Sequence, residues 1–124
     1  MHTIAIIEDT EDNRDLLYYL LRDEFTVLRY TSGEEALRNF DFHSPDVIVM
    51  DIKLPGLDGI EVLRHVRGHD RISEVPILAL TANAMMGDRE KYLAAGFNAY
   101  VAKPIVDIDN FIATVRHLLR SGKD

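Results

Sequence analysis

Five short runs of apolar residues recur along the chain, and each has the length of one β-strand. The runs Thr3 to Ile7, Val47 to Met50 and Ile77 to Leu80 are almost wholly apolar. Uninterrupted runs of this kind are typical of strands that are buried on both faces in a parallel sheet. The run Phe25 to Tyr30 is more polar on one side and favours an edge position, and Asn98 to Ala102 predicts a short fifth strand.

The segments between these runs carry apolar residues three and four positions apart, which is the spacing of amphipathic helices. We expect helices over about residues 12–22, after Ser32, after Asp58, from near Gly87 to Ala95, and from about Asp107. The last helix has the clearest pattern, and the residues that it should bury are Ile108, Phe111, Ile112, Val115, Leu118 and Leu119. Residues 121–124 are expected to form a frayed tail.

Polar residues mark where three of these helices begin or end. Ser32 with Glu35, and Asp58 with Glu61, have the spacing of capping boxes, in which each member satisfies a free backbone amide at the helix start. Gly96 is placed to end the fourth helix, because glycine adopts a left-handed backbone without steric cost.

Strands and helices therefore alternate along the whole chain, with no linker, repeat or low-complexity segment. Such alternation predicts an α/β fold in which one doubly wound parallel sheet is covered by helices on both faces. A length of 124 residues suits one domain, and we assign residues 1–124 to it.

Composition excludes several classes of function. The formal net charge is -7, from 14 Lys+Arg and 21 Asp+Glu, and this balance argues against a nucleic-acid-binding surface. The chain has no cysteine, so it has no disulfide, thiol chemistry or cysteine metal site. There is no targeting segment or apolar run long enough to insert into a membrane, and we expect a cytoplasmic protein.

The candidate chemistry lies where the predicted strands end. Glu8 and Asp9 follow the first strand, and Asp51, Thr81 and Lys103 follow the third, fourth and fifth. Each residue alone is explained by an ordinary turn, cap or solvated charge. In a parallel sheet, however, the carboxyl ends of the strands meet at one edge, where open α/β sheets bind their ligands.

Three carboxylates brought together at this edge repel one another and call for a cation. Oxygen ligands suit Mg²⁺, which typically takes one or two carboxylates together with phosphate oxygens. With a metal present, Asp51 could attack a phosphoryl group, and aspartyl phosphate is an established carboxylate intermediate. Lys103 could balance the charge on the phosphoryl oxygens, and Thr81 could donate a hydrogen bond to one of them.

These residues also carry a resemblance to a known family. The matching segments are Ile7-Glu8-Asp9, residues 49–59, Leu80-Thr81-Ala82 and residues 100–105, in this order along the chain. Over essentially its whole length the sequence resembles the receiver domain of two-component response regulators. The resemblance implies a flavodoxin-like fold with strand order 2-1-3-4-5, which agrees with an edge position for the second strand.

By this resemblance Asp51 is the phosphoacceptor, and Thr81 and Lys103 hold the phosphoryl group. Asp9 and Asp51 bind Mg²⁺ or Mn²⁺ directly, the backbone carbonyl of Lys53 is a further ligand, and Glu8 acts mostly through water. The family also has a cis peptide bond at the position before Pro104. Two differences from the commonest pattern are Glu8, where many members have Asp, and Lys53, which could change the dephosphorylation rate.

The resemblance further implies a switch, in which the hydroxyl of Thr81 moves towards the phosphoryl group and the ring of Tyr100 turns inward. This movement would reshape the face formed by the fourth helix, the fifth strand and the fifth helix, where a dimer could form. An ordinary packed strand aromatic is the alternative explanation of Tyr100.

Three other functions fit the sequence less well. A haloacid dehalogenase would need an acid two residues after its nucleophile, and Lys53 occupies that position. A nucleotide- or flavin-binding module would need a glycine-rich phosphate loop after a strand, and only Gly33 opens a helix. A calcium loop beginning at Asp9 would need glycine where Arg14 stands.

The sequence therefore predicts a phosphorylation-activated signalling switch rather than an enzyme with a metabolic substrate. Its donor would be a histidine kinase or a histidine phosphotransfer protein, and the segment from Thr81 to Glu90 resembles receivers of hybrid kinases and phosphorelays. It would catalyse its own phosphorylation and a slow dephosphorylation. The output would be contact with a downstream protein, because 124 residues leave no room for an effector domain; the alternative is that the sequence is a receiver cut from a longer chain.

Overall fold

The structure, a computed structural model, describes residues 1–82 and 88–121. Within this part of the chain strands and helices alternate, as the sequence predicts. They are β1 (Thr3–Ile7), α1 (Glu11–Leu21), β2 (Thr26–Tyr30), α2 (Gly33–Asn39), β3 (Val47–Asp51), α3 (Gly59–Arg67), β4 (Ile77–Thr81), α4 (Asp88–Ala95), β5 (Ala99–Ala102) and α5 (Ile108–Ser121).

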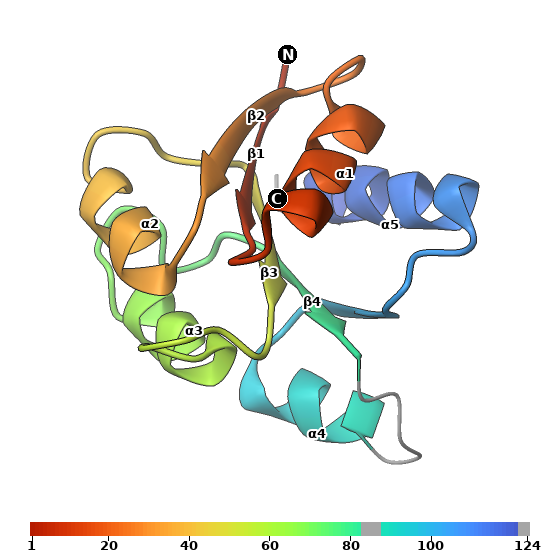
Figure 1. Ribbon diagram of the computed structural model, residues 1–124. Helices are drawn as coiled ribbons and strands as arrows, with labels where there is room; N and C mark the ends of the chain where they lie inside the picture. The colour runs from red at the N-terminus through yellow and green to blue at the C-terminus, as the bar shows by residue number, and fades with distance from the viewer. Residues whose placement is uncertain (83–87, 122–124) are drawn as a thin grey trace.

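The five strands form one parallel sheet in the order β2-β1-β3-β4-β5, which confirms the predicted fold class and the edge position of β2 (Figure 1). β3 is central, and all five of its residues are buried. All five residues of β4 are buried as well. These are the strands whose apolar runs are unbroken, since both of their faces lie under helices.

Two hydrophobic cores lie on opposite faces of the sheet. Helices α1 and α5 cover one face, where Leu17 and Leu21 pack near Phe111 and Val115. Helices α2, α3 and α4 cover the other face (Figure 1). The sheet is thus held rigidly from both sides, and its carboxyl edge is left for the loops that follow the strands.

The start of α3 has the capping box that the sequence predicts, in which Asp58 and Glu61 each accept a hydrogen bond from the other's backbone amide. At α2 only half of the predicted box forms. Ser32 accepts from the amide of Glu35, but the Glu35 carboxylate reaches past Ser32 and accepts from the amide of Thr31 at 2.7 Å. The helix start is still satisfied, because Glu35 ties down the residue that precedes the cap.

The predicted burial of Ile108 is wrong. Its side chain is 45% exposed, and the first fully buried residue of α5 is Phe111. The first turn of α5 therefore protrudes beyond the apolar face that the rest of the helix covers. Helical spacing shows which residues share a face, but it does not show where along a helix the contact with the sheet begins.

The other helix ends agree closely with the sequence. Gly96, just after α4, has a φ of +122°, in the region that favours glycine. The expected start of α4 near Gly87 lies outside the described residues, and so do residues 122–124 of the expected tail, whereas Ser121 still belongs to α5. In the described part of the chain no helix is long and apolar enough to cross a membrane.

Candidate active site

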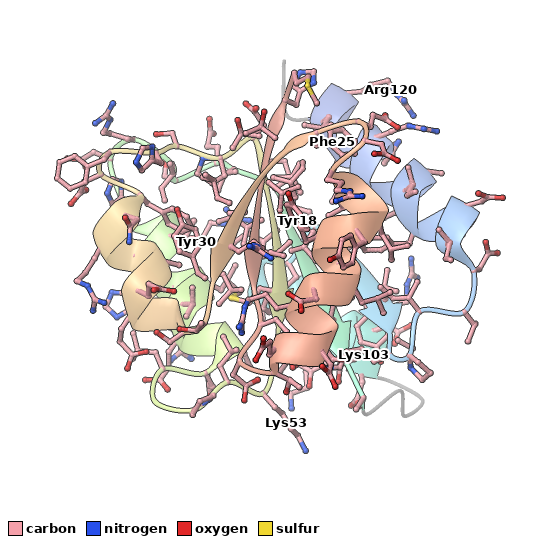
Figure 2. All side chains as sticks on the ribbon, turned by 45° about the horizontal axis from the view of Figure 1, so that its top comes forward. Tyr18, Phe25, Tyr30, Lys53, Lys103 and Arg120 are labelled. Carbon is pink, nitrogen blue, oxygen red and sulfur yellow. The ribbon has the colours of Figure 1, made fainter. Side chains whose placement is uncertain are left out.

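The strands bring the predicted site residues to one edge of the sheet. Asp51 is the last residue of β3, and Glu8 and Lys103 immediately follow β1 and β5. Thr81 ends β4 and is paired with Ala102 of β5. Lys53 and Lys103 lie at one end of the molecule and Phe25 and Arg120 at the other (Figure 2).

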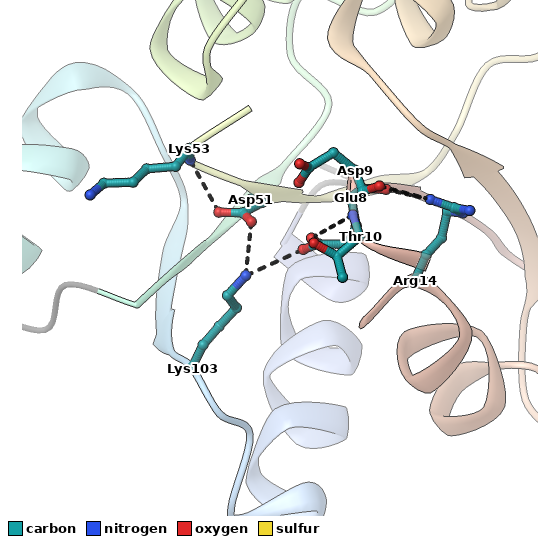
Figure 3. Close-up of polar contacts among 7 residues, drawn as sticks. All are labelled: Glu8, Asp9, Thr10, Arg14, Asp51, Lys53 and Lys103. Carbon is teal, nitrogen blue, oxygen red and sulfur yellow. Dashed lines mark hydrogen bonds and ion pairs between the residues drawn. The ribbon is translucent and has the colours of Figure 1, made fainter. Parts of the chain in front are cut away.

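Asp51 is held at both of its carboxylate oxygens. The ammonium nitrogen of Lys103 donates to Oδ2 at 2.8 Å, and the backbone amide of Lys53 donates to Oδ1 at 3.1 Å (Figure 3). The side chain of Asp51 is only 8% exposed. A buried carboxylate needs such partners, because removal from water penalises its charged form.

Lys103 is shared between two carboxylates. Its Nζ lies 3.4 Å from Oε2 of Glu8, whose side chain is almost completely buried, while Oε1 of Glu8 accepts from the amide of Thr10 at 3.3 Å (Figure 3). Burial on its own lowers the pKa of Lys103, but the hydrogen bonds and charges of Asp51 and Glu8 outweigh it and raise this pKa. Lys103 is therefore firmly cationic at neutral pH.

Glu8 is in the opposite situation. Burial, followed by the negative charge of Asp51, raises the pKa of Glu8, and Lys103 and the amide of Thr10 only partly oppose this rise. Its ionised form is thus disfavoured in the metal-free protein. A cation bound beside Glu8 and Asp51 would relieve the repulsion between them.

The carboxylates form a candidate metal site. Glu8, Asp9 and Asp51 each offer an oxygen, and the three oxygens lie within 4.8 Å of one another. Asp9 is exposed, so the cluster opens to solvent from its side. When all are ionised, the three carboxylates and the single ammonium of Lys103 leave an excess of two negative charges. An all-oxygen donor set with this charge and open access fits Mg²⁺.

The sequence did not predict the role of Arg14. Its Nη1 donates to the backbone carbonyl of Glu8 at 2.9 Å and to that of Asp9 at 3.4 Å (Figure 3). Arg14 lies in the first turn of α1, so it fixes the turn that presents both acids. The only sequence signal for this role is that Arg14 follows the acidic pair closely, and many arginines in helices follow acids in this way.

The two predicted switch residues lie on the same face of the sheet. Thr81 is buried at 2% exposure. Tyr100 of β5 is paired with Ala79 of β4, and Ala79 lies two residues before Thr81 in the same strand. Residues two apart on a strand point to the same side. The ring of Tyr100 is half-buried and stacks on Tyr92 of α4, with centroids 5.8 Å apart and planes 20° from parallel.

A cavity of about 230 Å³ opens next to Lys103. Glu8 and Lys103 line its polar side, and Leu16, Leu17 and Ile105 contribute to its apolar side. The peptide bond between Lys103 and Pro104, which also lines the cavity, is cis. The cavity thus borders one acid of the cluster, Glu8, and the cation Lys103.

Comparison with known proteins agrees with this architecture. Residues 4–116 match the response regulator receiver domain family. The chain is 37% identical over 118 residues to the polar-differentiation response regulator DivK of Brucella anthropi, which covers 94% of this chain and 95% of the relative.

Solved structures agree as well. The receiver domain of a sensor histidine kinase from Pseudomonas aeruginosa, with a magnesium ion coordinated in its active-site cleft, superposes with a TM-score of 0.86 at 35% identity, covering 96% of this chain and 98% of that one. A signal receiver domain of a histidine kinase from Syntrophus aciditrophicus gives a TM-score of 0.88 at 25% identity, covering 99% and 93%. The chain belongs to the response regulator receiver domain family and is a phosphorylation-activated signalling domain.

Proposed function

We propose that Asp51 accepts a phosphoryl group from a phosphohistidine of a histidine kinase or a histidine phosphotransfer protein. The observation that carries this proposal is the position of Asp51 at the end of β3, with Lys103 bonded to one oxygen and Glu8 next to Lys103. A nucleophile, a fixed cation and an acidic metal site are thus adjacent. Phosphoryl transfer needs this combination of positioning and charge neutralisation.

In the proposed reaction an oxygen of Asp51 forms a bond to phosphorus while the bond from phosphorus to the donor's imidazole nitrogen breaks. The imidazole leaves with the electron pair and takes up a proton from solvent. Lys103 stays within reach of the phosphoryl oxygens, because in the resting protein it already lies 2.8 Å from Asp51. The hydroxyl of Thr81 is proposed to donate to one of these oxygens.

Glu8, Asp9, Asp51 and the backbone carbonyl of Lys53 are proposed to hold Mg²⁺ or Mn²⁺. When bound, the ion would neutralise the charge that gathers between the acids and the phosphoryl group. The clustered carboxylate oxygens support the first three ligands. The amide of Lys53 already faces Asp51, so the backbone of this residue belongs to the site.

The cavity beside Lys103 supports a protein donor. It is lined by residues of α1, by Ile105 and by Lys103, and its volume of about 230 Å³ has room for an imidazole ring. Receiver domains act between histidine kinases and downstream targets rather than on metabolic substrates.

We make four further predictions together with this proposal. Asp51 phosphate would be hydrolysed slowly by the domain itself, and Lys53 could change the rate. Thr81 and Tyr100 would report phosphorylation to the α4–β5–α5 face, where a dimer could also form. Residues 1–124 would act as one domain, and a cytoplasmic location remains a prediction from the sequence.

A phosphotransfer assay tests the proposal. Radiolabelled phosphohistidine kinases and phosphotransfer proteins are mixed with the wild-type chain, with Asp51→Asn, and with Asp58→Asn as a control on a neighbouring exposed acid. We expect label on the wild type and on Asp58→Asn in the presence of Mg²⁺, and none on Asp51→Asn or after chelation. Label on Asp51→Asn, or transfer that is indifferent to chelation, would contradict the proposal.

A further inference from the structure

Tyr92 is the side chain that attaches α4 to the rest of the molecule. In the described part of α4 it is the only buried residue, at 8% exposure, whereas the others are exposed or half-buried. A helix with so little apolar surface depends on its few packed side chains for its position. The placement of α4 on the sheet therefore rests mainly on Tyr92.

The ring of Tyr92 is held between two other aromatic rings. On one side it stacks on Tyr100 of β5, and on another it meets Phe97 edge to face, with centroids 6.1 Å apart and planes at 90°. Phe97 is 3% exposed and belongs to the core beneath α3 and α4. Tyr92 thus connects a fixed core residue to the half-buried ring of Tyr100.

The carboxyl-terminal end of α4 is fixed independently. Arg67, at the end of α3, donates to the carbonyl of Gly96 at 3.0 Å and to Oδ1 of Asn98 at 2.8 Å. The same oxygen of Asn98 accepts from the amide of Ile77, which begins β4. This end of α4 is thus anchored to the sheet, and the Tyr92–Tyr100 stack is the contact nearer the phosphoryl site.

We propose that Tyr92 is a positioning residue that couples the orientation of the Tyr100 ring to the position of α4. The stack favours the resting orientation of Tyr100, and a turn of Tyr100 removes the surface on which Tyr92 and α4 rest. This inference rests on the proposed function, because it needs Tyr100 to move when Asp51 is phosphorylated. It adds a residue of α4 to that switch and assigns the stack the role of holding the resting state.

The size of the effect follows from the strength of aromatic pairs. Loss of one stack shifts a two-state equilibrium by roughly 2- to 10-fold. Tyr92→Leu keeps an apolar side chain but removes the stack, so it should move the resting protein towards the activated arrangement. Tyr92→Phe keeps the stack and loses only the hydroxyl. Phe97→Leu disturbs the same core and removes the edge-to-face contact with Tyr92, but it leaves both rings of the Tyr92–Tyr100 stack in place.

The experiment compares these variants with the wild type, each alone and with beryllofluoride and Mg²⁺ as a phosphoryl mimic. Fluorine NMR measures occupancy at Asp51, ring-proton NMR follows Tyr100, and hydrogen exchange follows the amides of residues 88–95. Phosphotransfer should persist in all three variants, because none of the substituted residues is part of the phosphoryl site, and in Tyr92→Leu its rate should change by no more than the roughly 2- to 10-fold shift in the equilibrium.

We expect Tyr92→Leu without the mimic to show Tyr100 shifts part of the way to the activated values and faster exchange in α4. Tyr92→Phe should match the wild type, and Phe97→Leu should lower stability without moving Tyr100. Wild-type behaviour of Tyr92→Leu, or an equal effect of Phe97→Leu, would overturn the inference while the proposed function stands. Failure of the wild-type chain to bind the mimic, or equal binding by Asp51→Asn, would overturn both.

Discussion

At the scale of single residues, the site is organised by one cation. Among the described residues Lys103 is the only side-chain cation that pairs with the carboxylates of Asp51 and Glu8, and both carboxylates are almost fully buried. Each member therefore depends on the others, since a buried charge without a partner is costly. Lys103 offsets part of the negative charge of the cluster, and the charge that remains favours a bound cation.

Replacing Lys103 should show this dependence. Lys103→Met leaves two buried carboxylates without their ammonium, and we expect the metal-free protein to lose about 3 kcal/mol of stability at pH 7. Saturating Mg²⁺ should recover part of this loss. Urea unfolding with and without Mg²⁺ measures both effects. Lys53→Met, whose exposed side chain makes no described contact with the acids, is the control, and an equal loss there would contradict the account.

Glu8 should behave in the opposite way. Because its folded pKa is raised above the ordinary value of 4.5, its ionisation destabilises the metal-free protein as the pH rises above that value. Glu8→Gln should therefore raise Tm at pH 7, have little effect near pH 4, and weaken Mg²⁺ binding. Thermal unfolding at the two pH values, with exposed Glu90→Gln as control, checks this. A lower Tm at pH 7 would contradict the pKa shift.

The sequence was sufficient to predict Glu8, Asp51, Thr81 and Lys103 as neighbours, because strand ends in a parallel sheet must meet. It could not predict Arg14, whose role depends on side-chain reach towards the carbonyls of the acidic turn. Nor could it predict that Tyr92 stacks on Tyr100, since that contact depends on how α4 is set against β5. Side-chain direction across elements is absent from a linear pattern.

At the scale of elements, two helix starts at the same edge differ in their caps. Asp58 caps α3 with its side chain and forms a full capping box, whereas Thr10 precedes α1 without a side-chain hydrogen bond to the helix. The start of α1 is supported instead by Arg14 and by acids in its first turn. Asp58 and Thr10 therefore allow a helix start with a side-chain cap to be compared with one that lacks it.

We expect Asp58→Ala to cost about 1 kcal/mol of unfolding free energy and Thr10→Ala to cost much less. Chemical denaturation of both variants in the metal-free state is the measurement. A loss at Thr10 as large as that at Asp58 would show that the α1 start depends on the threonine hydroxyl after all.

The elements themselves were predictable because their patterns are strong and local. The strands were located to within one residue of their ends, as with Val47–Asp51 and Ile77–Thr81. Two predictions about side chains were wrong. Glu35 accepts from the amide of Thr31 rather than from that of Ser32, and Ile108 is exposed at the protruding start of α5. Both depend on the path of the chain outside the regular element, which periodicity does not describe.

At the scale of the whole molecule, Arg67 joins elements at the end of the sheet opposite the site. Its guanidinium donates to the carbonyls of Ser73, Val75 and Gly96 and to the side chain of Asn98. Burial lowers the pKa of Arg67, and these four oxygens satisfy its buried donors. A single residue thus fixes the loops that flank β4 and β5.

Arg67→Met should cost about 3 kcal/mol, because it leaves several carbonyl groups without a donor. Arg116→Met is the matched control: Arg116 forms an exposed ion pair with Glu24, and its loss should have no measurable effect on stability. Urea unfolding of both variants provides the comparison. Equal losses would mean that the Arg67 contacts are no stronger than a surface pair.

The central claim is that the fold converges on Asp51 as the residue that receives the phosphoryl group. The most direct test is to phosphorylate the chain from a phosphohistidine donor, reduce the acyl phosphate with borohydride, and locate the resulting homoserine by mass spectrometry. The account predicts homoserine at position 51 when Mg²⁺ is present and none after chelation. Homoserine at Asp9 or Asp58, or labelling of position 51 without any divalent ion, would contradict it.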